Sequence, residues 1–319
     1  MPMTAIPYLT EARAPLTHRI EVVNQHGERQ SLDIPAERPL TVYVDKRELV
    51  TLMTLGERPE WLVLGYLINQ RLVPDAAAIA SITVDWEVGA AAVKTRAGIV
   101  DVEAKTAKRV VTTGCGQGSL FGEVMAHIEG IALPPTVVTQ AQVHAIVNTI
   151  RLQDSTYKSA GSVHGCALFR GSERLLFVED VGRHNAIDTI AGWMALQALG
   201  GGAAERFAQV KEEPVQRAGD TEQSALPPRL LAAEPLDVNG LIFYTTGRLT
   251  SEMVMKAAQM GVAVVISRSG MTQMGHAVAT DLGLCAIGRA LNTRFLCFSG
   301  AHRLQLEPAS QAEPAEVGV

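Results

Sequence analysis

The residue with the clearest chemical potential is Cys115, which lies in the run TTGCGQGS over residues 112–119. Glycines on both sides of this cysteine let its backbone adapt and leave its sulfur open to approach from several directions. A thiol reacts as a nucleophile in its thiolate form, which a nearby cation or histidine favours. The candidates for such a neighbour are Arg109, His164, Arg183 and His184.

The other three cysteines, Cys166, Cys285 and Cys297, lie among apolar residues in expected strands. Buried cysteines pack as small hydrophobic side chains, so we expect no chemistry from these three. None of the four cysteines forms a closely spaced zinc-type pair. The stretch His127-Ile128-Glu129 also lacks the Pro-Cys-x-x-Cys run that completes a zinc deaminase site, so we expect no metal in this protein.

A dense polar run, EDVGRHN, covers residues 179–185 and precedes an expected helix. It places two carboxylates, a guanidinium and an imidazole in one turn, which is typical of a functional site. We therefore select Asp180, Arg183 and His184, together with His164, as candidate supporting residues. A helix cap with local ion pairs is the alternative interpretation of the same run.

Three expected strands end in donor-rich runs: TTGR at 245–248, SRSG at 267–270 and GRALNTR at 288–294. The carboxyl ends of parallel strands share one edge of a sheet, where the following helices offer unpaired N–H groups. The guanidinium groups of Arg248, Arg268, Arg289 and Arg294 would add forked donors suited to phosphate. The pattern predicts a phosphate-bearing ligand, with ordinary caps and surface ion pairs as the alternative.

Two common phosphate-binding motifs are absent from the sequence. No Gly-x-Gly-x-x-Gly run opens the first helix after a strand, and no Gly-x-x-x-x-Gly-Lys-Ser/Thr run occurs. Hydride transfer and ATP hydrolysis therefore lack the backbone cradles that they usually need.

The strand ends belong to a βαβαβ segment, which is the clearest pattern in the chain. We expect strands at 241–244, 262–266, 284–287 and 295–298, and helices at 251–260 and 271–282. Upstream we expect a capped helix from Thr139 to about Leu152, a hairpin of strands 166–169 and 174–178, a polar turn at 179–185 and a helix at 186–196. Near the N-terminus we expect strands at 18–25 and 40–44, a helix opening at Pro59, and an antiparallel meander at 82–88, 91–96 and 99–104.

The chain has 319 residues, of which 47% are hydrophobic and 19% are charged. This composition is typical of a compact globular protein with one large or two modest domains. We expect an N-terminal tail at 1–18, an α+β region at 19–108, the main domain at 109–300 with a mobile insertion at 203–235, and a C-terminal tail at 301–319.

A net charge of −5 and an aromatic content of 5% argue against a broad cationic groove for nucleic acid. No apolar run approaches the roughly 18 residues that a membrane span needs, and the first 16 residues have no apolar signal core. We therefore expect a cytoplasmic protein without nucleic-acid or membrane partners.

With these segments in view, the chain resembles the FdhD family of formate dehydrogenase accessory proteins from about residue 18 to residue 300. The runs that carry the resemblance are TGCG at 113–116, GSVHG at 161–165, VEDVGRHNAID at 178–188 and TGRLTSEMV at 246–254. The resemblance implies an α/β fold with a cytidine-deaminase-like three-layer core and a mixed sheet, a smaller N-terminal α+β region, and a homodimer.

The resemblance also implies a sulfur carrier of the sulfurtransferase type. A cysteine desulfurase would load a persulfide on Cys115, and the sulfur would pass to the molybdenum cofactor, a bis(molybdopterin guanine dinucleotide), for formate dehydrogenase. The residues implied to contact the cofactor are Ala290, Leu291, Asn292, Thr293, Arg294 and Phe295, and Arg248, Arg268 and Arg289 are further candidates.

The chain departs from the family pattern at one position in the cysteine loop. Many members have Cys-Gly-x-Cys-Gly, whereas Gly118 occupies the place of the second cysteine here. A carrier with one loop thiol is chemically sufficient. Two other functions remain open: a cysteine hydrolase with His164 or His184 as base, oriented by Asp180 or Asn185, and a noncatalytic nucleotide-binding module.

Overall fold

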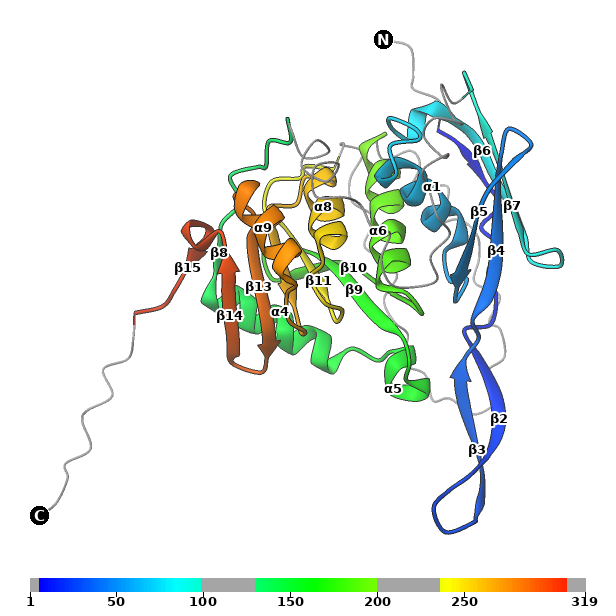
Figure 1. Ribbon diagram of the computed structural model, residues 1–319, viewed down its shortest axis with the longest axis horizontal. Helices are drawn as coiled ribbons and strands as arrows, with labels where there is room; N and C mark the ends of the chain where they lie inside the picture. The colour runs from blue at the N-terminus through cyan, green and yellow to red at the C-terminus, as the bar shows by residue number, and fades with distance from the viewer. Residues whose placement is uncertain (1–5, 99–129, 200–235, 309–319) are drawn as a thin grey trace, which may run out of the picture.

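The computed structural model describes residues 6–98, 130–199 and 236–308. Two β-sheets lie on either side of a packed pair of helices, α1 (Pro59–Asn69) and α6 (Arg183–Ala198) (Figure 1). The larger sheet and its helices contain the expected βαβαβ segment, and the smaller sheet belongs to the N-terminal region. The Cys115 loop, the expected strand at 99–104 and the insertion at 203–235 lie outside the described residues.

The larger sheet has six strands in the order β10-β9-β11-β12-β13-β14. Strands β11, β12 and β13 are parallel, whereas β9, β10 and β14 run antiparallel to their neighbours, so the sheet is mixed as predicted. Its strands are β9 (His164–Arg170), β10 (Glu173–Asp180), β11 (Leu241–Thr245), β12 (Val264–Ser267), β13 (Cys285–Leu291) and β14 (Arg294–Ser299).

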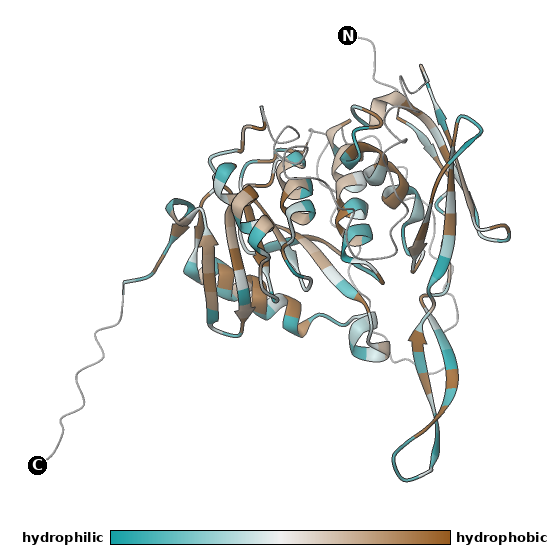
Figure 2. Ribbon diagram, in the orientation of Figure 1, coloured by the Kyte–Doolittle hydropathy of each residue, from teal (hydrophilic) through white to brown (hydrophobic). Residues whose placement is uncertain are grey.

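Helices cover both faces of this sheet. Helix α6, helix α8 (Ser251–Gln259) and helix α9 (Gln273–Asp281) pack on one face, and α4 (Gln140–Leu152) packs on the other. The strands alternate accordingly: Phe243 faces the first layer, and Tyr244 faces α4. Hydrophobic residues line these contacts (Figure 2), which confirms the three-layer core, while the specific likeness to cytidine deaminases stays a prediction.

Helix α4 begins as the sequence predicts. The side chain of Thr139 accepts a hydrogen bond from the backbone N–H of Gln142 at 3.1 Å, and the Gln142 side chain accepts one from the Thr139 N–H at 2.9 Å. This reciprocal pair satisfies two N–H groups that a helix otherwise leaves unpaired. Short elements flank the layer: β8 (Val138–Thr139), α5 (Thr156–Ala160), η2 (Ala301–Arg303) and β15 (Leu304–Gln305).

The smaller sheet has five strands in the order β1-β6-β7-β4-β5, and α1 packs against it. Its strands are β1 (Tyr8–Leu9), β4 (Arg38–Val44), β5 (Arg47–Thr54), β6 (Ile79–Asp85) and β7 (Ala90–Thr95), with η1 (Ala76–Ala78) before β6. A separate hairpin, β2 (Thr17–Val23) and β3 (Arg29–Pro35), projects from the body (Figure 1). Parts of both expected tails are structured, because β1 pairs with β6 and β15 pairs with β8.

Two glycines allow α1 and α6 to touch through their backbones. A Cβ atom at Gly65 would lie 1.7 Å from the carbonyl oxygen of Asp188, and a Cβ atom at Gly192 would lie 1.9 Å from that of Trp61. No larger residue fits at either crossing point without moving a helix. The contact fixes α6, whose N-terminus carries Arg183 and His184, against the N-terminal region.

Among the boundaries that differ from the sequence predictions, two lie at the strand ends that carry candidate site residues. The expected polar turn at 179–185 is wrong in part, because Glu179 and Asp180 belong to β10 and α6 begins at Arg183. The run 288–294 is also not a simple loop, because β13 continues to Leu291 and turns directly into β14. Backbone pairing extends the strand: the N–H of Arg289 donates to the Ser269 carbonyl at 2.7 Å, and Ala290 is buried.

Candidate functional site

Five segments meet at one edge of the larger sheet. Strand β9 starts there at His164, opposite Asp180 at the end of β10, while β11 ends beside it at Thr245. Helices α6 and α8 both begin close to these strand ends, at Arg183 and Ser251. The antiparallel register of β9 with both neighbours therefore gathers the predicted supporting residues at one place.

Four predicted residues form a cationic and imidazole cluster at this edge. The Nδ1 atom of His164 lies 3.5 Å from the Thr246 hydroxyl. Burial lowers the pKa of His164, and the positive charges of Arg183 and Arg248 lower it further. Arg183 and His164 also lower the pKa of His184, so Arg183 acts on both imidazoles, while Arg248 acts on His164.

Arg183 has an unusual environment for a guanidinium group. The residue is only 7% exposed, and its Nε atom has no hydrogen-bond partner among the residues that the structure describes. Its aliphatic part lies against Gly247, where a Cβ atom would come within 2.7 Å of the Arg183 Cδ. Gly247 therefore makes room for a positive charge held at the N-terminus of α6, where the helix dipole is also positive.

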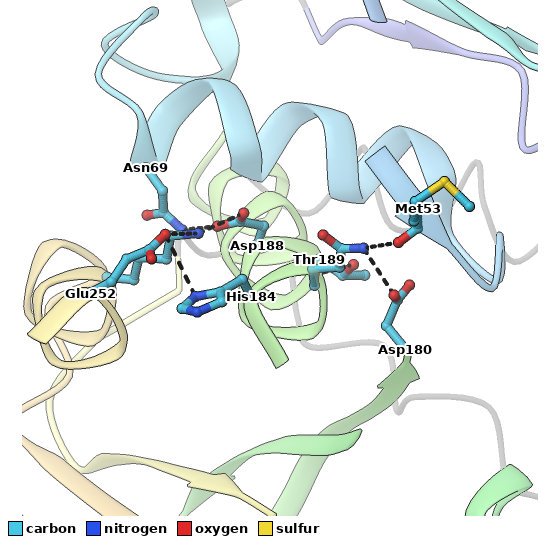
Figure 3. Close-up of polar contacts among 9 residues, drawn as sticks. Met53, Asn69, Asp180, His184, Asp188, Thr189 and Glu252 are labelled. Atoms are coloured by element: carbon cyan, nitrogen blue, oxygen red, sulfur yellow. Dashed lines mark hydrogen bonds and ion pairs between the residues drawn. The ribbon is translucent and has the colours of Figure 1, made fainter. Parts of the chain in front are cut away.

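A buried chain of charged groups continues from His184 into the protein (Figure 3). His184 Nδ1 lies 3.6 Å from a Glu252 carboxylate oxygen, and Lys256 Nζ lies 3.4 Å from the same oxygen. Lys256 also contacts Asp188 at 2.8 Å, and the Asn69 amide donates to Asp188 at 2.7 Å. Three helices, α1, α6 and α8, thus contribute to one polar network.

Burial and the charges of this network together set the protonation state of His184. Burial lowers the pKa of His184 to about 4, although the Glu252 carboxylate opposes the shift. Burial alone would lower the pKa of Lys256, but Asp188 and Glu252 more than offset this effect and raise it. His184 is therefore a neutral imidazole near pH 7, with Glu252 beside Nδ1.

Glu252 and Lys256 were not among the predicted site residues, although the sequence of α8 contains a pattern that indicates them. Lys256 shares the buried side of the helix with Met253 and Ala257, and it follows Glu252 by four residues. A lysine on an otherwise apolar helix face indicates a buried carboxylate partner.

Asp180 connects the two halves of the molecule. Its carboxylate accepts hydrogen bonds from the Thr54 hydroxyl at 2.5 Å and from the Asn185 amide at 2.9 Å. Asn185 also donates to the Met53 carbonyl at 2.6 Å (Figure 3). Among the described residues, the hydrogen bonds of Asp180 and Asn185 do not reach His164 or His184, and the carboxylate beside His184 belongs to Glu252.

The arginines of the strand ends are exposed at the same edge. Backbone hydrogen bonds link these ends, since the Arg268 N–H donates to the Thr245 carbonyl at 3.0 Å. Within the stretch implied to contact a cofactor, Ala290 is buried and Phe295 is half-buried, with its ring 5.8 Å from that of His144. Exposed positions of the edge are Arg248, Arg268, Arg289, Leu291, Asn292, Thr293 and Arg294.

The described cysteines divide into two kinds. Cys166 is fully buried, its thiol donates to the Thr245 hydroxyl at 3.3 Å, and burial raises its pKa to about 12. Cys285 is also fully buried, so packing roles are confirmed for these two positions. Cys297 departs from the prediction, because it is half-buried on β14, the outermost strand of the sheet.

Two kinds of feature are absent from the described residues. Within these ranges no three histidine, cysteine, aspartate or glutamate side chains gather as a metal site would require. None of the helices that the structure describes has the length and apolar character needed to cross a membrane.

Comparison with known proteins decides the family. The sequence model of the FdhD/NarQ family matches residues 35–207 and 230–305. This chain belongs to the FdhD/NarQ family. Among its FdhD relatives, the sulfur carrier protein FdhD of Bacillus subtilis is 26% identical over 275 residues, which cover 84% of this chain and 89% of the relative. The protein of the same description from Listeria innocua is 27% identical over 276 residues, covering 85% and 91%.

A solved structure shows the same fold. The crystal structure of a protein described as a formate dehydrogenase accessory protein from Desulfotalea psychrophila superposes with a TM-score of 0.64. The two chains are 22% identical, and the match covers 91% of this chain and all of the other. The FdhD/NarQ fold therefore accounts for both sheets and for the strand edge described above.

Proposed function

We propose that this chain is a sulfur carrier in the maturation of formate dehydrogenase. It would receive sulfur from a cysteine desulfurase as a persulfide on Cys115 and pass it to a bis(molybdopterin guanine dinucleotide) molybdenum cofactor. The observation that carries the proposal is the match to the FdhD/NarQ family over 35–207, which includes the Gly-Cys-Gly run, together with relatives named sulfur carrier proteins. We further expect a homodimer in the cytoplasm.

The transfer itself needs one nucleophilic thiol. The Cys115 thiolate attacks the outer sulfur of the desulfurase persulfide, the sulfur–sulfur bond breaks, and the desulfurase cysteine leaves as a thiolate. The outer sulfur keeps its oxidation state and is now bound to Cys115. No oxidant or reductant is consumed, so the absence of a second loop thiol at Gly118 is no obstacle.

The strand edge supplies what an anionic client would require. Arg183 is buried at the N-terminus of α6, and Arg248, Arg268, Arg289 and Arg294 are exposed at neighbouring strand ends. Guanidinium groups form charge-assisted hydrogen bonds with phosphate oxygens. The guanine dinucleotide parts of the client carry such phosphates, and this match of charge supports the edge as its binding face.

The first experiment follows sulfur from radiolabelled cysteine onto the protein in the presence of a cysteine desulfurase. We expect label on the wild-type chain and none on Cys115→Ala, because the transfer step requires the Cys115 thiolate as its nucleophile. Cys166→Ala is the matched control and should keep the label, because Cys166 is fully buried and its thiol cannot reach the desulfurase persulfide. Equal labelling of Cys115→Ala and wild type would refute Cys115 as the acceptor.

The second experiment measures GDP binding by calorimetry, with GDP as a fragment of the client. We expect Arg294→Ala to weaken binding by roughly 1.5 to 3 kcal/mol, the loss of a charge-assisted phosphate contact. Arg170→Ala serves as the control, because Arg170 ends β9 at the opposite edge and donates to the Asp237 carbonyl. Unchanged GDP affinity of Arg294→Ala would remove this residue from the binding face.

A further inference from the structure

Two helices begin side by side at the strand edge. Helix α6 follows Gly182, and helix α8 follows Thr250. Their first turns are close together, because the His184 Nδ1 atom of α6 lies 3.6 Å from a Glu252 carboxylate oxygen of α8 (Figure 3). Each first turn has backbone N–H groups without an intrahelical partner and lies at the positive end of a helix dipole. Two such ends at one place favour a bound anion.

Thr250 has the backbone of a helix cap but does not act as one. Its φ of −92° and ψ of 167° are typical of a cap position, yet its side chain accepts no hydrogen bond from α8. Its hydroxyl oxygen is shielded from solvent and has no partner among the described residues. The threonines that precede α4 and α9, Thr139 and Thr272, both accept such a bond. The unpaired Thr250 hydroxyl therefore indicates a ligand that the helix itself does not supply.

Arg183 is a second side chain that lacks a partner at this place. It is only 7% exposed, and within the described ranges its Nε atom donates no hydrogen bond and its guanidinium forms no ion pair with a carboxylate. Its Cδ atom lies against Gly247, which belongs to the turn between β11 and α8. The side chain therefore runs from the start of α6 toward the start of α8. A buried cation without a counter-ion is costly, and an anion at this place would remove that cost.

The carboxylates of the buried network do not serve as that counter-ion. Glu252 and Asp188 both contact Lys256, at 3.4 Å and 2.8 Å, so its ammonium group offsets their charge. Arg248 is exposed in the turn that leads into α8 and adds a further positive charge. Positive side chains therefore outnumber carboxylates in this group, which leaves the charge of an anion to be accommodated beside Arg183.

We propose that the paired N-termini of α6 and α8, together with Arg183 and Thr250, bind one phosphate-type oxyanion. The Arg183 guanidinium and the Thr250 hydroxyl would donate hydrogen bonds, and N–H groups of the two first turns would donate others. These donors belong to two helices and come from different directions. A tetrahedral phosphate group presents oxygens toward all of them, whereas a planar carboxylate has only two oxygens. Because the Nε atom and the hydroxyl are shielded from solvent, entry of the anion requires side chains at this edge to rotate.

The inference deepens the proposed function, on which it rests for the source of the phosphate. A guanine dinucleotide client carries phosphate groups, and free inorganic phosphate has the same chemistry. The two sources differ in what else binds, because only a nucleotide also places a guanosine on the edge. Inorganic phosphate, GDP and guanosine are therefore the three probes that separate them.

The test measures binding of the three probes to the full-length chain by calorimetry, with wild type, Arg183→Gln and Thr250→Val. We expect both variants to bind phosphate and GDP about tenfold more weakly than wild type, the loss of a charge-assisted hydrogen bond. Guanosine has no phosphate, so its affinity should be equal in the three proteins. With this pattern, tighter binding of GDP than of phosphate would identify a nucleotide as the source, and equal binding would identify the free oxyanion.

A matched variant, Thr272→Val, separates ligand binding from helix capping. The Thr250 hydroxyl has no partner in the described part of the chain, so Thr250→Val should keep the urea midpoint of the free protein. The Thr272 hydroxyl accepts a hydrogen bond from the Gly275 N–H at 3.2 Å, so Thr272→Val should lower that midpoint and leave phosphate binding unchanged. Wild-type affinity of both Thr250→Val and Arg183→Gln for phosphate and GDP would overturn the inference, as would a wild type that binds neither probe.

The inference and the proposed function fail in different ways. Weaker GDP binding by Arg294→Ala, with full binding by Arg183→Gln and Thr250→Val, would overturn this site and leave the client face of the proposed function intact. Weaker phosphate binding by the two site variants, in a chain that gains no desulfurase-dependent sulfur on Cys115, would support the site and refute the carrier function.

Discussion

Among single residues, His184 has a protonation state fixed by its surroundings. It lies at the N-terminus of α6, mostly buried, between the positive Arg183 and the Glu252–Lys256 pair. Protonation would add a third positive charge to a site that already contains Arg183 and Lys256. His184 therefore stays neutral where an ordinary histidine begins to gain a proton.

Because His184 stays neutral in the folded protein, we predict that its ionisation makes stability depend on pH. The folded pKa of His184, about 4, lies below the unfolded value of 6.5, so the unfolded chain binds more protons between these values. The contribution of His184 to the free energy of unfolding is complete above pH 6.5 and is lost as the pH falls toward 4. On going from pH 7 to pH 4, wild type should lose up to about 3 kcal/mol more unfolding free energy than His184→Gln.

Urea unfolding across that pH range measures the effect. The two proteins should differ most in slope between pH 6.5 and pH 4, and they should run parallel above pH 7. Equal slopes over the acid range would mean that His184 titrates in the folded protein as an exposed histidine does.

Among the secondary-structure elements, the crossing of α1 and α6 is the contact most sensitive to side-chain size. Gly65 and Gly192 bring the two backbones together, and Asp188, which pairs with Lys256, lies on α6 at this crossing. Moving α6 would therefore disturb the crossing, the buried ion pair and the site edge at the same time.

We expect Gly65→Ala to lower the free energy of unfolding by about 3 kcal/mol or more. The added methyl group meets a backbone carbonyl, which cannot rotate away as a side chain can. Gly270→Ala is the control, because a Cβ atom there meets no atom within 4 Å and should change stability by less than about 0.5 kcal/mol. Equal stabilities of the two variants in urea unfolding would contradict this description of the crossing.

The elements also show which features the sequence could predict. The capping box of Thr139 and the hairpin around Gly171 involve residues close together in the chain, and both were predicted correctly. The hydrogen bond between Thr54 and Asp180 spans 126 residues, and that between Lys256 and Asp188 spans 68. Local periodicity contains no information on such pairs, so the long-range partners of Asp180 and Lys256 could not be predicted from it.

At the scale of the whole molecule, the structure combines a two-sheet scaffold with one arginine-bearing strand edge. The family motifs at 161–165, 178–188 and 246–254 come from β9, β10, α6, the turn that follows β11, and α8, and they converge at this edge. Their spacing in the sequence does not by itself show that the three motifs lie close together, and only the family resemblance links them at that level. The register of the mixed sheet gives the physical reason for their proximity.

The central claim is that Cys115 carries sulfur, and peptide mapping after incubation with a cysteine desulfurase and free cysteine tests it most directly. We expect the tryptic peptide 110–151 of the wild-type chain, which contains Cys115, to gain one sulfur atom. A reducing agent should remove this sulfur. An unmodified 110–151 peptide, in a protein that the desulfurase has had full opportunity to load, would contradict it.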